Sequence, residues 1–319
     1  MPPHVGKPLP VPTTDAQDDY NQAMDHVEGR FGEPDLATAA TLMAKAAAKG
    51  YAQAQYQLGV WHDHGIGVPQ NDSQARHWYE QAALQGDAAA QCNLGVIHAL
   101  GQGVPQDDAK AAFWYEKAAL QGDPQGEYNL GYIYQYSDTV PQDLAKAHHW
   151  YSKAAAQEEP DALWRLGEMH MQGEGAPRDP QKAADYFRRA AALGQRDGQF
   201  YLGHDYLTGH LVEADKAKAR FWLEKAAQQE EGRAQYHLGL LLLPAQPFRP
   251  CAFERTVAGV APLPETAPTA ALLEAIHWLK AAAAQGHVPA QNKLRQLRSM
   301  RHSANDNYPS GKGLERESE

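Results

Sequence analysis

Apolar and small residues recur along the chain with a fixed spacing of 36 residues. Leucine-glycine pairs mark the steps of this period and begin at Leu58, Leu94, Leu130, Leu166, Leu202 and Leu238. Aromatic residues form a second series with the same spacing, at Trp78, Trp114, Trp150, Tyr186 and Trp222, and Trp278 follows after one period and 20 further residues. Repetition at about 20 to 50 residues is typical of solenoids and related arrays. The pattern therefore predicts a stack of similar units rather than one compact core.

Each unit is predicted to contain two helices. Ala54, Leu58 and His62 are spaced four apart, which places them on one stripe of a first helix over 54–64, called helix A. The glycines and proline of 65–70 form a turn, and a second helix, called helix B, follows and ends near Gly86. Short polar residues suited to cap helix B stand at its start in five units: Asn71, Asp107, Asp143, Asp179 and Asp215.

The glycine of each leucine-glycine pair lies inside helix A, where it costs about 1 kcal/mol relative to alanine. Its recurrence indicates a compensating close approach of a neighbouring helix. Helix B carries alanines with the same period, among them Ala75 and Ala82. We expect these alanines to face Gly59 and its equivalents, and the stacking of units to bury both surfaces.

The domain boundaries follow from where the repeat begins, ends and is interrupted. We place the solenoid at 18–302, with a degenerate first unit, about six clear units and a C-terminal capping helix. Residues 1–17 and 303–319 are expected to be disordered. A proline-rich insertion over 244–269 interrupts the sixth unit and predicts a long loop. This loop is either a tolerated insertion or a segment that lines the ligand groove.

Composition and charge narrow the class of partner. The 319 residues are 43% hydrophobic and 21% charged, with a net charge of −10, so nucleic acid and anionic membranes are unfavourable partners. Cys92 and Cys251 are too few for a disulfide framework. The N-terminus has no signal-peptide pattern, and no segment has the length and apolarity of a membrane span. These features predict a cytoplasmic protein, or a periplasmic or secreted one if a signal peptide has been removed.

The sequence carries no catalytic or metal-binding motif. His62, His98 and His170 share one register of helix A, and equivalent positions of stacked units lie on the order of 10 Å apart, too far to share a metal ion. The Gly-x-Gly turns follow helices rather than strands, unlike nucleotide-binding loops. Cys92 is expected to be a small buried residue. We therefore expect no catalytic residue, no metal and no cofactor.

The motif Ala-x-x-x-Leu-Gly followed by Gly-x-Gly-Val-Pro and Trp-Tyr-x-Lys-Ala-Ala resembles the Sel-1-like repeat family, a relative of tetratricopeptide arrays, and residues 90–122 match it almost position for position. The resemblance covers roughly 20–297. It implies an all-α, right-handed α-solenoid that acts as an adaptor for protein or peptide ligands, in a bacterial signalling, stress or assembly pathway. Ser137 and Thr139 replace turn glycines, and Glu158 and Glu230 replace glycines at the ends of helix B. We expect these units to bend differently from their neighbours.

A ligand is expected on the concave face of the superhelix, which helix A lines. The residues predicted to face away from the packing stripe and to contact a peptide are Gln57, Trp61, Asn93, Asn129, Tyr132, Tyr136 and Arg165. The amides of Gln57, Asn93 and Asn129 are suited to bond the backbone of an extended peptide, and the aromatic side chains to hold its apolar residues. The alternative is that these amides are a family consensus without direct contact.

The sequence thus favours a non-enzymatic scaffold that binds a partner peptide or domain in this groove, as a monomer or a weak homo-oligomer. Two alternatives stay open, a cell-wall or β-lactam hydrolase and a self-assembling structural or regulatory subunit. The hydrolase requires a nucleophile beside a base, which no motif supplies, and the cysteine pairs of the family's lactamase-labelled branch are absent. Self-assembly predicts a mass that rises with concentration.

Overall fold

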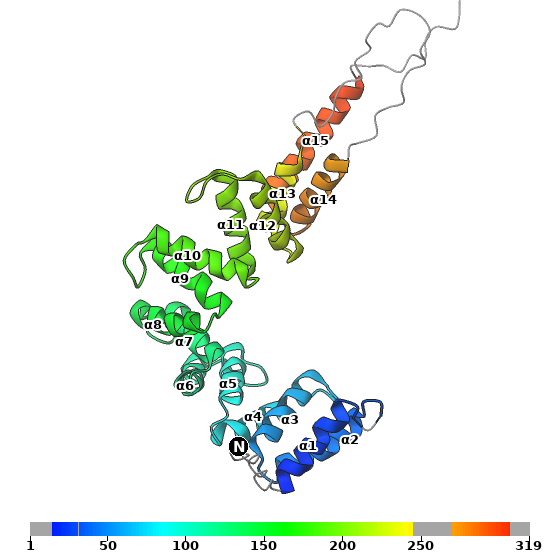
Figure 1. Cartoon of the computed structure of the whole chain (residues 1–319), viewed down its shortest axis with the longest axis vertical. Coiled ribbons are helices and arrows are strands. Elements are labelled where there is room, and N and C mark those ends of the chain that lie inside the picture. Colours follow the sequence, from blue (N-terminus) through cyan, green and yellow to red (C-terminus); the bar gives the residue numbers. More distant parts are fainter. Residues whose placement is uncertain (1–14, 31, 245–269, 307–319) are drawn as a thin grey trace, which may run out of the picture. The chain divides into compact units, whose positions relative to one another are not determined.

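A computed structural model describes residues 15–30, 32–244 and 270–306, and every regular element in this part of the chain is an α-helix (Figure 1). Helices that follow one another in the sequence pack together within each compact body. This confirms the predicted all-α array of helix-turn-helix repeats. The predictions for 1–14, for the insertion at 245–269 and for 307–319 lie outside the described residues.

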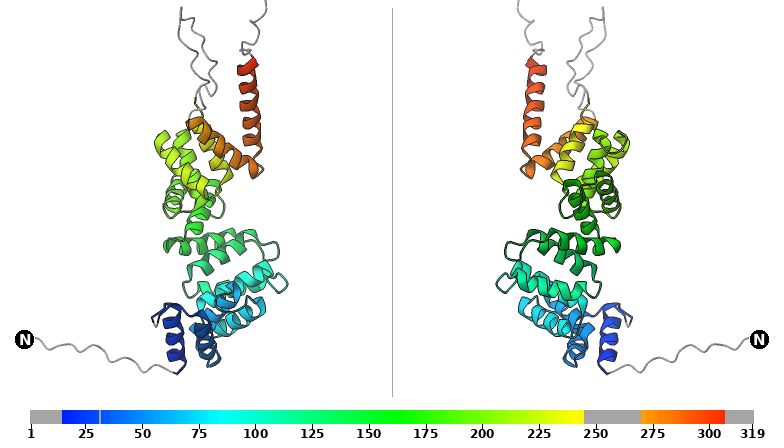
Figure 2. Two further views of the ribbon diagram at one scale, coloured as in Figure 1. Left: turned by 90° about the vertical axis from the view of Figure 1, so that its right-hand side faces the viewer. Right: turned by 90° about the vertical axis from the view of Figure 1, so that its left-hand side faces the viewer.

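The helices belong to two compact bodies, divided between Arg178 and Asp179. Figure 2 gives two further views of these helices, coloured along the sequence. The N-terminal body contains α1 (Asp15–Val27), α2 (Leu36–Ala48), α3 (Ala52–His64), α4 (Asp72–Leu84), α5 (Ala88–Leu100), α6 (Asp108–Ala119), α7 (Pro124–Tyr136), α8 (Leu144–Ala156) and α9 (Pro160–Gln172). The C-terminal body contains α10 (Pro180–Ala192), α11 (Arg196–Thr208), α12 (Lys216–Gln228), α13 (Gly232–Leu242), α14 (Ala270–Ala284) and α15 (Val288–Asp306).

The helices alternate between the two predicted types. The A helices are α3, α5, α7, α9, α11 and α13, and the B helices are α2, α4, α6, α8, α10, α12 and α14. Where both partners lie in the same body, an A helix packs against its own B helix and against the B helix before it, as α3 does with α4 and α2. The helical region is longer than the predicted 18–302, because α1 begins at Asp15 and α15 continues to Asp306.

The predicted caps of helix B are confirmed in all five units. The side chain of Asn71 accepts a hydrogen bond of 3.0 Å from the backbone nitrogen of Gln74. Asp107, Asp143, Asp179 and Asp215 accept the equivalent bond three residues ahead. Each cap satisfies one of the donors that a helix start leaves without an intrahelical partner, so a local sequence signal fixes where helix B begins.

The end of helix B keeps a left-handed backbone in the two repeats where glutamate replaces its glycine, whereas Ser137, which replaces the glycine after helix A, has an extended backbone with a φ of −65°. Gly86, which ends helix B, has a φ of 95°. Glu158 and Glu230 stand at the equivalent position and have φ values of 61° and 62°. A side chain in this region is strained because its Cβ crowds the following carbonyl oxygen. The backbone conformation is therefore kept at both positions, and the two glutamates carry the strain.

The glycine inside helix A makes room for a large side chain of helix B. A Cβ atom built on Gly59 would lie 2.7 Å from the ring of Tyr79, and one on Gly131 would lie 2.8 Å from the ring of Tyr151. The predicted close approach is confirmed. The expected alanine, Ala75, lies near Gly59 through its carbonyl oxygen, at 3.3 Å, but the ring of Tyr79 lies nearer, which the prediction did not include. Sequence spacing alone could not show which position of helix B points at the glycine.

A buried glutamine amide joins most A helices to the repeat before them. Gln55 donates from Nε2 to the carbonyl oxygen of Ala47, in the preceding B helix, at 3.0 Å. Its Oε1 accepts a bond of 2.7 Å from Nε2 of Gln85, at the end of its own B helix. We call this pair of bonds a rung. Rungs of the same kind are centred on Gln91, Gln199 and Gln235.

Two repeats depart from the rung. Glu127 occupies the glutamine position on α7, is 3% exposed, and accepts a bond of 2.9 Å from Nε2 of Gln157. In the next repeat Leu163 and Leu193 stand at the two positions that glutamines fill elsewhere. The glutamine pair of the rung is thus complete in most repeats, has one glutamate in the repeat of α7, and is replaced by two leucines in the next repeat.

Candidate functional site

Three tyrosines lie one helical turn apart on α7. The ring centroids of Tyr128 and Tyr132 are 6.5 Å apart, and those of Tyr132 and Tyr136 are 4.8 Å apart. Tyr128 also packs on the buried Tyr151 of α8, at 5.7 Å. Tyr132 and Tyr136 are 43% and 46% exposed. The core thus supports the base of this row while its other two rings face solvent.

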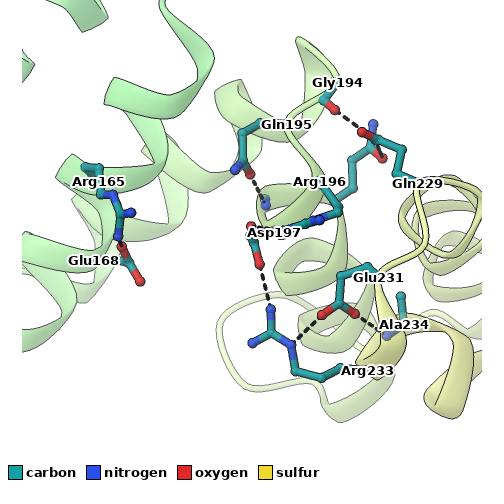
Figure 3. Close-up of polar contacts among 12 residues, drawn as sticks. Arg165, Glu168, Gly194, Gln195, Arg196, Asp197, Gln229, Glu231, Arg233 and Ala234 are labelled. Carbon is teal, nitrogen blue, oxygen red and sulfur yellow. Dashed lines mark hydrogen bonds and ion pairs between the residues drawn. The ribbon is translucent and has the colours of Figure 1, made fainter. Parts of the chain in front are cut away.

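Arg165 of α9 crosses this row of rings. Its Nη1 donates to the hydroxyl oxygen of Tyr136 at 3.2 Å and to Oε2 of Glu168 at 2.9 Å. Its guanidinium carbon lies 5.1 Å from the ring centroid of Tyr136 and 5.6 Å from that of Tyr132, a cation–π geometry. Arg165 and Glu168 point toward each other along α9 (Figure 3). We call Tyr128, Tyr132, Tyr136, Arg165 and Glu168 the tyrosine cluster.

The electrostatics of the cluster favour neutral rings beside a permanent cation. Burial raises the pKa of Tyr136 and of Tyr128, and the charge of Arg165 opposes this rise in both. Burial works to lower the pKa of Arg165, but the neighbouring Tyr136 and Glu168 outweigh burial, and the pKa is raised. Neither residue type is thereby tuned to accept a proton near neutral pH. The arrangement is suited to contact and orientation rather than to acid–base chemistry.

The structure brings three of the predicted site residues together, namely Tyr132, Tyr136 and Arg165. The other predicted residues lie apart from this contact network. Asn129 donates to Sγ of Cys92 at 3.6 Å, and Gln57 and Asn93 are half-buried.

Trp61 is a correction to the predicted ligand-facing register. It is 2% exposed and belongs to a core cluster with Ala54 and Leu58. Its equivalents are also buried: Ile97, Ile133, Met169 and Asp205. The reason is that Trp61 follows Leu58 by three residues, which places both side chains on the same helix face.

Glu168 and Tyr128 belong to the site but were absent from the predicted set. Glu168 follows Arg165 by three residues and Tyr128 precedes Tyr132 by four, the two spacings at which helical side chains meet. These spacings were the available signal in the sequence. Cys92 is buried, as predicted, and burial raises the pKa of its thiol to about 12, so it is a poor nucleophile.

A second polar network lies in the C-terminal body. Arg233 of α13 donates to Oδ1 of Asp197, on α11, and to Oε1 of Glu231, both at 2.6 Å (Figure 3). Asp197 and Arg233 are 36 residues apart and so occupy the same register of successive A helices. Glu231 also accepts from the backbone nitrogen of Ala234 and caps α13. Asp197 joins α11 to α13 through Arg233, and Glu231 caps α13. This network therefore has a structural role.

Two kinds of site are absent from the part of the chain that the structure describes. Across 15–30, 32–244 and 270–306, histidine, cysteine and acidic side chains nowhere gather in a group of three or more that could hold a metal ion. In the same residues, none of the helices combines the length and the apolar character needed to cross a membrane.

The chain matches the model of the Sel1 repeat at residues 26–51, 52–87, 88–123, 124–158, 160–195, 196–230 and 272–287. A protective antigen of uropathogenic Escherichia coli strains that displays an SLR fold is 32% identical, with a TM-score of 0.71 over 89% of this chain and 56% of that protein. This chain therefore spans little more than half of that protein's length. A Sel1 repeat protein from Oxalobacter formigenes is 30% identical, with a TM-score of 0.69 over 88% and 76% of the two chains. No curated protein matches this chain.

Proposed function

Because this chain belongs to the Sel1 repeat family, whose members are generally protein-interaction scaffolds, we propose that it is a non-enzymatic scaffold that binds a protein partner at the tyrosine cluster. The observation that carries this proposal is the exposure of Tyr132 and Tyr136 above a buried support. Tyrosine is enriched in the centres of protein interfaces, where its ring buries a large area and its hydroxyl group bonds the partner. Neighbouring rings with solvent access on one helix are a suitable anchor for a peptide or a domain edge.

The rigidity of the cluster supports a binding role. Tyr128 is packed on Tyr151, and Arg165 contacts the other two rings while it is held by Glu168. Side chains that are already ordered lose little conformational entropy when a partner binds. The polar Asn129 lies one residue after Tyr128 on α7, within the predicted amide series. We propose that it contributes polar contacts beside the aromatic anchor.

The chemistry of the cluster favours binding over catalysis. Hydrolysis of an acyl compound requires a nucleophile next to a group that takes its proton. The tyrosines of the cluster have raised pKa values and Arg165 is a permanent cation. Cys92 is buried with a raised pKa. We therefore prefer the scaffold to the hydrolase.

The test is capture of a partner from a lysate of the source organism by the immobilised full-length chain. The double variant Tyr132→Ser with Tyr136→Ser removes the exposed rings. Phe113→Ser is the matched control, because Phe113 is 51% exposed but lies on the B helix α6. We expect one protein to be captured by wild type and by the control, and to be lost from the double variant. Circular dichroism and thermal melting establish that both variants keep their fold.

Two results contradict the proposal. Capture of the same protein by the double variant would place the contact elsewhere on the chain. A sedimentation mass that doubles with concentration, and that returns to the monomer in the double variant, would show that the tyrosine cluster serves self-assembly instead.

A further inference from the structure

The N-terminal body is strongly acidic. Its described residues up to Arg178 include 23 aspartates and glutamates against 10 lysines and arginines. In the C-terminal body, residues 179–244 and 270–306 contain 11 acidic and 14 basic residues. The negative charge of the molecule is therefore concentrated in the body that carries the tyrosine cluster, and a cationic partner would be steered toward it.

The same sign of charge surrounds the cluster itself. Burial is the largest cause of the raised pKa of Tyr128, and Arg165 opposes it. The negative charge of Asp161 also raises this pKa. Glu168 and Glu174 act in the same way on Tyr136. Three carboxylates thus stand within electrostatic range of the rings, against the one guanidinium of Arg165.

The rings are already shown to accept a guanidinium group. Arg165 lies within cation–π distance of both Tyr132 and Tyr136, yet these two residues are still 43% and 46% exposed. An exposed tyrosine ring amid carboxylates attracts a second cation, because the negative π-system and the surrounding negative charge act together.

We propose that the tyrosine cluster recognises an arginine-bearing segment of its protein partner, with a guanidinium group of that segment seated on the exposed surface of Tyr132 and Tyr136. This inference rests on the proposed function and adds the chemistry of the partner. Arginine fits better than lysine because its planar guanidinium stacks on aromatic faces and is more weakly hydrated. The carboxylates nearby supply attraction to the charge, and the rings supply the preference for a flat cation.

The experiment uses fluorescence anisotropy of three labelled peptides that differ only in one residue type. The first peptide carries three arginines separated by glycine and serine, the second carries lysines, and the third carries citrullines, which have the shape of arginine without its charge. Each is titrated with the full-length chain at low and at physiological salt. We expect the citrulline peptide to bind at least tenfold more weakly than the arginine peptide, and the lysine peptide at least threefold more weakly.

Variants of the chain locate the binding site. Tyr132→Phe with Tyr136→Phe keeps both π-faces and is expected to bind the arginine peptide within twofold of wild type. Tyr132→Leu with Tyr136→Leu keeps apolar bulk without the π-faces and is expected to bind at least fivefold more weakly. Phe113→Leu is the matched control on α6 and is expected to bind as wild type does. Its ring already lies under the ammonium of Lys117, at 4.9 Å.

Each contrary result overturns a stated part of the proposal. Equal binding of the citrulline peptide, or no binding of the arginine peptide, excludes recognition of a cation. Equal binding by the leucine double variant moves the site away from the rings, and equal binding of the lysine peptide removes the preference for guanidinium. If the native partner is still lost from the serine double variant while the arginine peptide does not bind, only this inference fails. If that partner is retained, the proposed function fails.

Discussion

Glu127 accepts a hydrogen bond of 2.9 Å from Nε2 of Gln157 at a position where other repeats place a glutamine. Those glutamines also donate, as Gln55 does to the carbonyl oxygen of Ala47 and Gln91 to that of Ala83, both at 3.0 Å. An ionised carboxylate has no proton to donate. Glu127 therefore makes half of a rung at neutral pH, and burial raises its pKa.

Glu127→Gln is expected to raise the free energy of unfolding by about 1 kcal/mol at pH 8, because it removes a desolvated charge and restores a donor. The pKa of Glu127 is higher in the folded state than in the unfolded state. The free energy of unfolding of the wild type, compared with that of the variant, is therefore highest below the unfolded pKa of about 4.3. It falls as the pH rises through the folded pKa of Glu127. Urea midpoints measured between pH 4 and pH 8 check this, and a difference that does not grow with pH contradicts it.

Glu230→Gly is expected to stabilise the C-terminal body by about 1 kcal/mol, because glycine adopts a positive φ without strain. The gain is partly offset by the larger entropy of the unfolded glycine chain. Glu230→Ala is the control: it removes the carboxylate but keeps the Cβ that causes the strain, so we expect no gain. If alanine stabilises as much as glycine, the charge rather than the φ of 62° is responsible. Thermal melting of the three proteins decides between these causes.

Gly59→Ala is expected to destabilise the chain by about 2 kcal/mol, since its new methyl group would overlap the buried ring of Tyr79. The same substitution in a Tyr79→Ala background is expected to be nearly neutral. The coupling between the two sites in a double-mutant cycle is the measured quantity. A coupling close to zero would mean that the glycine is required for a reason other than this ring.

Gln91→Leu is expected to destabilise by about 1 to 2 kcal/mol, because Gln121 and the carbonyl oxygen of Ala83 lose their buried partner. Adding Gln121→Leu should recover part of that loss. The chain itself carries leucines at both positions in one repeat, at Leu163 and Leu193. Denaturant midpoints of the single and double variants test this, and a double variant that is less stable than either single one would reject the compensation.

Sequence reasoning succeeded where the signal is local. The 36-residue period, the two helices of each unit and the cap at Asn71 depend on residues within a few positions of one another. The left-handed turn at Gly86 belongs to the same class. Such features are written into short stretches of sequence, and the family model agrees with them along most of the chain.

Predictions from the sequence were wrong where they depend on which face of a helix packs against a neighbouring helix. The helix register relative to Leu58 predicts that Trp61 faces the ligand groove, yet its spacing of three residues from Leu58 places it in the core. The alanine series predicts an alanine opposite Gly59, and the nearest side chain there is the ring of Tyr79. The rung glutamines Gln55 and Gln91 stand one period apart, but a polar residue that recurs on a helix gives no sign by itself that it is buried, since an exposed face carries polar residues too.

The rung also bears on how a chain of this kind changes length. In repeats without an insertion its two partners lie 8 residues before the central glutamine and 30 residues after it. For Gln235, whose repeat carries the insertion, the second partner is Gln285, 50 residues after it. Removing or duplicating one block of 36 residues, such as 88–123, leaves an equivalent carbonyl and an equivalent glutamine at both distances. The hydrogen bonds of a rung therefore do not depend on how many repeats precede or follow it. Tandem duplication can lengthen the molecule by whole repeats without any new interface having to evolve.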